Sequence, residues 1–232
     1  MKLKDFKGLF KTSHVEFVKA TNVYEDYYEI ELKPEAGTSW VSGMHAVFTL
    51  PNKKVKGKKF RAFSIASTQK ENTILLGTRT GKEVSSFKQA LLSMKQGEKV
   101  KMRGPFGWFY LMNDSSPIVM IALGVGITPI RALLTELEDK SDRKVNVVYS
   151  SPYYMYQEHI DRIAQNNDAI NVNYVSTIEE TQAKYIEHAK KHGNAAYYYI
   201  SGTQQAIKSI KDTLKELGIK KSRMIFDPFF GY

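Results

Sequence analysis

The segment from Arg61 to Ser67 contains three side chains that could hold a phosphorylated aromatic cofactor. The guanidinium of Arg61 can pair with a phosphate. The ring of Phe63 can stack on a flat heterocycle, and the hydroxyl of Ser64 can hydrogen-bond the edge of that ring. This set of groups fits a flavin, whose reactive atom N5 would lie near Ser64. The alternative is an ordinary strand with an exposed arginine.

The geometry of a strand restricts how this segment could bind. Side chains alternate between the two faces, so Arg61, Phe63 and Ile65 would share one face, opposite Ala62 and Ser64. Because the arginine and the serine then point to different faces, we expect the cofactor to lie across an end of the strand.

A second candidate phosphate site lies between Gly81 and Phe87. Ser85 suits the N-cap position of the helix that follows. The free amides of that helix start, together with the hydroxyls of Ser85 and Ser86, could bind a pyrophosphate. A plain capped helix is the alternative.

The third chemical signal is the turn from Gly124 to Pro129, which follows a continuous apolar run. Its glycines let the backbone approach a pyrophosphate, Thr128 adds a hydroxyl, and Pro129 suits the first turn of a helix. The turn differs from the Gly-x-Gly-x-x-Gly fingerprint, because Pro129 stands three residues after Gly126. We interpret it as a candidate dinucleotide turn.

In this order, the motifs resemble those of the ferredoxin–NADP reductase superfamily. The flavin strand of that superfamily has the pattern Arg-x-aromatic-Ser, usually with tyrosine where this chain has Phe63. A Gly-x-x-Ser-type turn follows, which Gly81 and Ser85 match with one additional residue between them. The Gly-Val-Gly-x-Thr-Pro turn of the superfamily matches residues 124–129.

Two later segments extend the resemblance to the end of the chain. Residues 199–203 are similar to the Cys-Gly-Pro strand end of the family, with Ser201 and Thr203 in place of the cysteine and the proline. Residues 227–232 are similar to the Glu-x-Phe-x-Gly-Tyr ending of bacterial members, with Asp227 in place of the glutamate. One of the terminal aromatic side chains would cover the flavin face where the nicotinamide docks. The alternative is a hydrophobic plug.

The resemblance implies an FAD-dependent oxidoreductase that uses NADH or NADPH, since a pyrophosphate site indicates FAD rather than FMN. Hydride would pass from C4 of the nicotinamide to N5 of the flavin, with Ser64 and Asp227 as the catalytic residues. The glycines and side chains of the motifs would bind the cofactors. The expected cofactor-binding residues are Arg61, Ala62, Phe63, Ser64, Gly77, Thr78, Gly81, Val84, Ser85, Ser86, Gly124, Gly126, Thr128, Pro129, Ser150, Ser201, Gly202, Phe229, Phe230 and Tyr232.

The choice between the two nicotinamide nucleotides depends on one more stretch. Family members that prefer NADPH hold its additional phosphate with arginine and serine side chains after the second strand of the nucleotide domain. Here that stretch is residues 149–154, where Pro152 stands in place of an arginine and Ser150 remains. We therefore expect NADH to be used at least as well as NADPH.

The elements that would position these motifs fall into two halves. The first half contains short alternating strands between turn residues, which predicts a small antiparallel β-barrel. Its expected strands are residues 14–19, 27–32, 45–50, 59–66, 73–80 and 98–102, and its expected helix is 84–95.

The second half alternates strands with helices, which predicts a doubly wound α/β domain with a parallel sheet. Its expected strands are residues 118–123, 144–149, 170–175, 196–200 and 223–226, and its expected helices are 130–138, 155–164, 181–191 and 204–217. We therefore expect a two-domain chain, with an FAD-binding β-barrel domain over residues 1–112 and an NAD(P)-binding α/β domain over residues 113–232.

The charge of the chain indicates what kind of partner it attracts. The 232-residue chain has a formal net charge of +10, and five lysines lie between Lys53 and Lys59. Such a surface attracts acidic partners, and electron carriers of the ferredoxin or flavodoxin type are usually acidic. We therefore expect an acidic electron-carrier protein as the second substrate, with a solvated basic loop as the alternative. Nucleic-acid binding is not expected, because no recognisable binding fold surrounds the basic run.

Two other functions stay open at this point. The chain could reduce a small molecule or free flavin directly. It could also be a catalytically silent dinucleotide-binding subunit of a larger assembly. The presence of both Ser64 and the glycine turn favours an enzyme.

The composition excludes several kinds of site. The chain has no cysteine, which excludes disulfides, cysteine-ligated zinc and an iron–sulfur cluster, and its five histidines lack metal-ligand spacing. The longest apolar run, residues 118–127, is too short to span a membrane. Residues 1–11 contain no apolar stretch of signal-peptide length. We therefore expect a cytoplasmic protein with no metal site.

Overall fold

The computed structural model describes residues 8–113, 115–140 and 143–228. The chain divides into two compact units, of which the first ends at Tyr110 and the second begins at Leu111. The predicted domain boundary after residue 112 lies two residues further along. Within the described ranges, no helix is long and apolar enough to cross a membrane. The cytoplasmic location stays a prediction.

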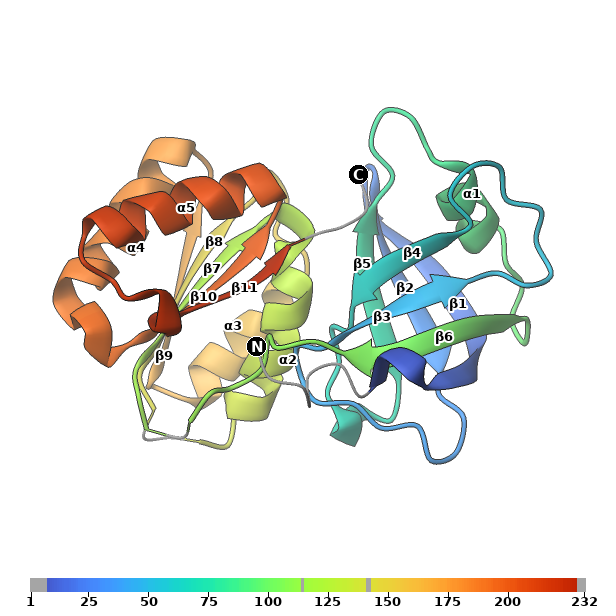
Figure 1. Cartoon of the computed structure of the whole chain (residues 1–232), viewed down its shortest axis with the longest axis horizontal. Helices are drawn as coiled ribbons and strands as arrows, with labels where there is room; N and C mark the ends of the chain where they lie inside the picture. Colours follow the sequence, from blue (N-terminus) through green and yellow to red (C-terminus); the bar gives the residue numbers. More distant parts are fainter. Residues whose placement is uncertain (1–7, 114, 141–142, 229–232) are drawn as a thin grey trace. The chain divides into compact units, whose positions relative to one another are not determined.

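The first unit is a six-stranded antiparallel sheet in the order β4-β3-β6-β1-β2-β5 (Figure 1). The two ends of this order are joined, because the amide of Ala66 donates to the carbonyl of Leu75 at 2.8 Å. This bond closes the sheet into the predicted barrel. The elements are β1 (Thr12–Tyr24), β2 (Tyr27–Lys33), β3 (His45–Thr49), β4 (Phe60–Ser64), β5 (Ile74–Arg79), α1 (Ser86–Leu92) and β6 (Lys99–Phe106).

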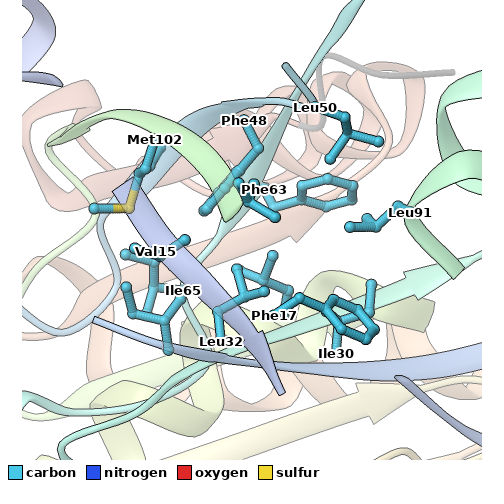
Figure 2. Packing of buried hydrophobic residues seen from close by; sticks show 14 of the residues in the cluster. Val15, Phe17, Ile30, Leu32, Phe48, Leu50, Phe63, Ile65, Leu91 and Met102 are labelled. Carbon is cyan, nitrogen blue, oxygen red and sulfur yellow. The ribbon is translucent and has the colours of Figure 1, made fainter. Parts of the chain in front are cut away.

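The inward side chains of these strands form the core of the barrel. Figure 2 shows Phe63 of β4 among Phe48, Leu50 and Leu91, in the same hydrophobic cluster. The side chain of Phe63 is only 7% exposed. Burial of a side chain of this size contributes about 1.5–3 kcal/mol. The core therefore holds β4 against β3 and α1.

The second unit is a five-stranded parallel sheet in the order β11-β10-β7-β8-β9. Helices α2 and α3 cover one face of the sheet, and α4 and α5 cover the other (Figure 1). The strands are β7 (Ile118–Leu123), β8 (Val145–Ser150), β9 (Ile170–Val175), β10 (Tyr197–Gly202) and β11 (Met224–Pro228), and the helices are α2 (Ile127–Leu137), α3 (Gln157–Asn166), α4 (Ile178–His192) and α5 (Gln204–Glu216).

The structure confirms the predicted fold class and order of elements and corrects several boundaries. β1 continues to Tyr24, because two register irregularities interrupt the alternation on which the shorter prediction depended. Helix α1 is shorter than predicted, since Ser85 caps its start and Ser93 follows its last turn. Helix α4 begins three residues earlier than predicted, where Thr177 and Glu180 form a capping box.

Candidate functional site

Strand β4 places the side chains of the predicted flavin motif on two faces. Phe63 points into the core, where the centroid of its ring lies 5.9 Å from that of Phe48 and 6.4 Å from that of Phe87. Arg61 lies on the same side, with its guanidinium 5.5 Å from the centre of the Phe87 ring. Ser64 is paired in register with His45 of β3. The stacking of Phe63 on a flavin stays a prediction, since one side of its ring is covered by the core.

The guanidinium of Arg61 keeps a donor for a ligand. Its Nη1 donates to the carbonyls of Lys58 and Phe60, both at 2.9 Å. Its Nε is buried and has no hydrogen-bond partner among the residues that the structure describes. A buried polar group without a partner costs about 1–3 kcal/mol. A phosphate oxygen that accepted from this atom would therefore stabilise the folded protein.

His45 is a neighbour of Ser64 that the sequence pattern did not single out. Ser64 is 5% exposed, and the ring of His45 packs edge-on against Phe106 at 4.5 Å between centroids. Burial lowers the pKa of His45 to about 4, so its imidazole is neutral at pH 7. A neutral neighbour is compatible with a hydrogen bond from Ser64 to an uncharged ring edge. In the sequence, His45 is simply one position of an alternating strand.

Three residues of the predicted pyrophosphate turn make bonds within the protein. The hydroxyl of Ser85 accepts from the third residue after it at 3.4 Å, and that of Ser86 accepts from the amide of Lys56 at 3.0 Å. Each hydroxyl still has a hydrogen atom to donate. The amide of Gly81, in contrast, is used by Asp26 at 2.9 Å. Helix α1 has only seven residues, so the side chains are better candidates than its amides.

The ring of Phe87 connects the two flavin motifs. It contacts Arg61 of β4, and Phe87 directly follows Ser86 in the chain. The other predicted flavin residues of this unit are distributed over the same strand, the neighbouring strand and the start of the helix. Ala62 is on β4, Gly77 and Thr78 are on β5, and Val84 precedes the N-cap of α1.

In the second unit, a glycine turn leads from β7 into α2. Gly124 has a φ of +57° and open space where a Cβ would stand. A Cβ on Gly126 would come within 2.3 Å of the carbonyl oxygen of Ser201. The two glycines therefore differ: Gly126 lets the turn pack against β10, whereas the space beside Gly124 is open, and a ligand there stays a prediction. Pro129 lies in the first turn of α2, as predicted.

The carboxyl ends of β10 and β11 place two predicted residues side by side. Ser201 and Asp227 are register partners and are 0% and 4% exposed. The hydroxyl of Ser201 has no hydrogen-bond partner within the described part of the chain. A buried hydroxyl beside a carboxylate could bind an amide group, such as a carboxamide. The hydroxyl of Thr128, by contrast, donates to Val125 at 2.9 Å and stabilises the turn.

A cavity of about 430 Å³ lies at the carboxyl edge of the parallel sheet. Open α/β sheets bind ligands at this edge, where the strand order reverses. Here the reversal lies between β7 and β10, and the cavity is lined by Leu123 at the end of β7 and by Thr203, which directly follows β10. The lining residues are Leu123, Ser150, Ile178, Thr181, Gln182, Tyr185, Thr203, Gln205, Ala206, Ser209 and Ile210.

From the sequence, residues 149–154 were expected to determine the choice between NADH and NADPH. The residues that line this cavity are mostly different ones. Of the stretch 149–154, Ser150 alone is among the lining residues, whereas Thr181 and Gln182 come from α4. These α4 residues were not predicted, because they are far from any glycine motif in the chain. The Thr177-x-x-Glu180 capping box was the one available signal for a helix start at this edge.

Some predictions fall on residues that the structure does not describe. Phe229, Phe230 and Tyr232 lie outside the described ranges, and so does their predicted contact with the flavin. In residues 8–113, 115–140 and 143–228, no group of three or more histidine, aspartate or glutamate side chains could hold a metal ion.

Comparison with known protein sequences finds a family match within the second unit. Residues 120–212 match a family described as the oxidoreductase NAD-binding domain. The electron transfer component of toluate 1,2-dioxygenase from Pseudomonas putida is 24% identical over 182 residues, which cover 73% of this chain and 54% of that protein. The chain spans about half the length of the curated relatives it matches.

Solved structures share the fold of both units. The ferredoxin-NADP+ reductase of Plasmodium falciparum with 2'P-AMP has a TM-score of 0.79 at 17% identity and covers 96% of this chain and 99% of that one. The flavohemoglobin of Malassezia yamatoensis has a TM-score of 0.78 at 18% identity and covers 94% of this chain and 60% of that one. At these identities the structural likeness shows the fold alone, and the match over residues 120–212 shows an oxidoreductase NAD-binding domain in the second unit. Both findings agree with the predicted resemblance to the ferredoxin–NADP reductase superfamily.

The substitution Arg61→Ala is expected to weaken flavin binding. It removes a charge-assisted contact worth about 1.5–3 kcal/mol, which corresponds to about 10- to 150-fold in the dissociation constant. Titration of the apoprotein with FAD, followed by flavin fluorescence, measures the effect. Lys101→Ala removes an exposed lysine of β6 and is the matched control. Equal affinities for Arg61→Ala and the control would contradict the assignment.

Proposed function

We propose that this chain is an FAD-dependent NAD(P)H oxidoreductase that passes electrons from a nicotinamide nucleotide to a small carrier protein. The observation that carries the proposal is the buried Nε of Arg61, which has no hydrogen-bond partner in the described part of the chain, in a protein whose second unit matches an oxidoreductase NAD-binding domain. The barrel over residues 1–112 would bind FAD, and residues 113–232 would bind the nucleotide.

Relatives of the same fold support this choice of cofactors. The flavohemoglobin structure contains FAD, and the ferredoxin-NADP+ reductase structure contains 2'P-AMP. Bound FAD would supply the chemistry that converts a two-electron hydride donor into a source of single electrons. The protein would supply binding and orientation.

We assign the binding of FAD to residues of the first unit and the binding of the nicotinamide nucleotide to residues of the second. In the first unit, Arg61 would bind a phosphate of FAD with the hydroxyls of α1, and Ser64 would hydrogen-bond the flavin ring. In the second unit, the turn at Gly124 would accept the pyrophosphate of the nucleotide. Ser201 and Asp227, which are neighbours in the sheet, would orient the nicotinamide through its carboxamide.

The colour of the purified protein and the reduction of its flavin by NADH or NADPH test the proposal directly. The purified protein, or the protein after incubation with FAD, is expected to be yellow and to lose its absorbance near 450 nm when NADH or NADPH is added without oxygen. The extracted pigment should be FAD. A protein that binds only FMN, or no flavin, would overturn the proposal, and a yellow protein that no nicotinamide nucleotide reduces would leave only a binding role.

The cavity of the second unit favours NADH over NADPH. None of its lining residues carries a charge. Glu180, close to it on α4, accepts backbone hydrogen bonds from Ser176 and Thr177 at 3.0 and 3.2 Å. These bonds lower the pKa of Glu180, so it is ionised at pH 7. An additional phosphate on the adenosine ribose would find no cation on this wall and a carboxylate near it.

We expect the ratio of kcat/KM for NADH to that for NADPH to be one or greater. Gln182→Arg should shift this ratio toward NADPH by about tenfold, because it puts a cation on the cavity wall. Gln182→Met, which adds no charge, is the matched control and should leave the ratio unchanged. A wild-type preference of about a hundredfold for NADPH, about 2.7 kcal/mol, would refute the specificity.

A lysine-rich hollow in the first unit supports an acidic carrier. A hollow of about 650 Å³ is lined by residues 49–51, 53–56 and Lys59, with four lysines among them. Lys53 pairs with Glu98 at 2.8 Å, whereas Lys54, Lys56 and Lys59 are exposed. These exposed cations would attract an acidic ferredoxin or flavodoxin over long distances.

Reduction of an acidic ferredoxin should therefore slow steeply with salt, because the Debye length falls from about 10 Å at 0.1 M to about 3 Å at 1 M. The double variant Lys54→Glu/Lys56→Glu should slow it at low salt and leave hydride transfer from NADH to the bound flavin unchanged. Lys190→Glu/Lys191→Glu, on α4 of the other unit, makes the same change in net charge and is the control. A ferredoxin rate that is indifferent to both salt and the first pair would favour direct reduction of a small molecule.

A further inference from the structure

Helix α4 is held on the parallel sheet of the second unit by few apolar side chains. Its buried residues are Thr181, Tyr185, His188 and Ala189, of which Tyr185 and Ala189 belong to the hydrophobic core cluster. Helix α2, which covers the other face of the sheet (Figure 1), buries nine residues. Elements with few buried apolar contacts open more easily than the rest of a domain. The attachment of α4 therefore depends on how well its buried polar side chains are accommodated.

His188 is a buried polar side chain on this face of α4. It is 6% exposed, and neither of its ring nitrogens has a hydrogen-bond partner among the residues that the structure describes. Burial lowers the pKa of His188, so its ring is neutral at pH 7. A charged ring in the same place would cost much more free energy than the neutral ring, because no partner compensates for the loss of water.

His192 lies one turn further along α4 and forms a pair with His188. The centroids of the two rings are 6.4 Å apart, and the ring planes are 21° from parallel. Nε2 of His192 lies 3.4 Å from Nδ2 of Asn146 on β8, which can donate to this nitrogen while the ring is neutral. Burial and the charges of Lys191 and Lys144 lower the pKa of His192 as well. We call His188 and His192 the histidine pair.

The charges on α4 itself do not compensate for a proton on this pair. Glu187 favours the charged form of His188, but its carboxylate is already bound to the ammonium of Lys184 at 3.0 Å. The positive charges of Lys184, Lys191 and His192 disfavour it. Protonation of either histidine would therefore add a charge to a region that already repels it.

The elements packed against α4 supply no buried anion either. β7 and residues 193–195 contain no ionisable side chain. Tyr198 of β10 donates to the carbonyl of Gly193 at 2.8 Å, and burial raises its pKa to about 12, so it is neutral. Tyr149 of β8 and Tyr174 of β9 pack together, and Tyr174 donates to Asp161 of α3, on the other face of the sheet. Helix α5 contributes buried Ile207, Ile210 and Leu214, whereas none of its ionisable residues is buried: Lys208, Lys211, Asp212, Lys215 and Glu216.

The face of α4 that carries the histidine pair also lines the cavity at the carboxyl edge of the sheet. Thr181 and Tyr185 line this cavity. Residues 181, 185, 188 and 192 recur at the spacing of one helix face, so the cavity wall and the histidine pair belong to one stripe. Movement of α4 away from β8 would displace the wall of the cavity. The attachment of α4 and the affinity of the cavity for its ligand are therefore coupled.

We propose that the histidine pair makes the cavity sensitive to acid: protonation of His188 loosens α4 from the sheet and thereby weakens the binding of the nicotinamide nucleotide. This inference rests on the proposed function for the identity of the ligand. Since His188 binds a proton more weakly when α4 is packed than when it is open, acid favours the open form. The loss should begin below a pH of about 6.5, the ordinary pKa of histidine, and grow as the pH falls toward the lower pKa of the packed form.

The test compares the wild type with His188→Leu, which removes the titrating ring, and with His14→Leu, which removes an exposed histidine of β1 in the first unit. His188→Gln is a second variant without a titrating ring, in case the leucine variant does not fold. The readouts at pH 7.5 and pH 5.5 are the calorimetric dissociation constant for NAD+ and the hydrogen-exchange protection factors of α4 amides relative to those of α5.

For the wild type, we expect the affinity for NAD+ to fall about three- to tenfold at pH 5.5, because one linked proton changes an equilibrium by up to about tenfold per pH unit. The protection of α4 should fall with it, while that of α5 changes less. His14→Leu should behave as the wild type does. His188→Leu and His188→Gln should keep both the affinity and the protection of α4 at pH 5.5.

Three results would overturn the inference. The first is a wild type whose NAD+ affinity and α4 protection are the same at both pH values. The second is a loss at pH 5.5 that both His188 variants share in full, which would assign it to another group. The third is a loss of affinity while α4 stays protected. Failure of the proposed function gives a different pattern: α4 protection would still depend on pH and on His188, but NAD+ would bind at neither pH.

Discussion

Closure of the barrel at the end of β4 is the constraint on which the first unit depends. On one side, the amide of Ile65 donates to the carbonyl of Met44 at 2.9 Å. On the other side, the amide of Ala66 donates to the carbonyl of Leu75 at 2.8 Å. These bonds fix β4 between β3 and β5, and they thereby decide which of its side chains enter the core. The position of Arg61 follows from this closure rather than from a local preference of the strand.

At the carboxyl edge of the parallel sheet, close packing decides which segments lie next to each other. Gly126 lets the turn after β7 approach the backbone of β10, where a Cβ would come within 2.3 Å of a carbonyl oxygen. This approach brings the turn next to Ser201, and the register of the sheet places Ser201 beside Asp227. Three segments that are distant in the chain therefore meet at one edge. The cavity between α4 and α5 opens at the same edge, so one end of the sheet concentrates the features that fit a nucleotide.

Two of the buried polar atoms that have no hydrogen-bond partner among the described residues lie in the proposed binding regions, while others, such as the ring nitrogens of His188, lie elsewhere. Most buried polar groups are bonded, as is expected for a folded domain. The exceptions include Nε of Arg61 and the hydroxyl of Ser201, which lie in the two regions that the motifs marked. Buried polar atoms without partners lower the stability of the folded protein, and a ligand that supplies these partners binds more tightly because of them.

The sequence by itself determined the class of fold and the order of elements, because hydrophobic periodicity and turn residues are local properties. It also marked Arg61, Gly124 and Ser201, whose residue types fit phosphate and nucleotide chemistry. Only the tertiary structure decided that Gly126 packs while Gly124 stays open, and that Gln182 lines the cavity. Burial and the proximity of charges arise from contacts between distant segments, and periodicity does not encode those contacts.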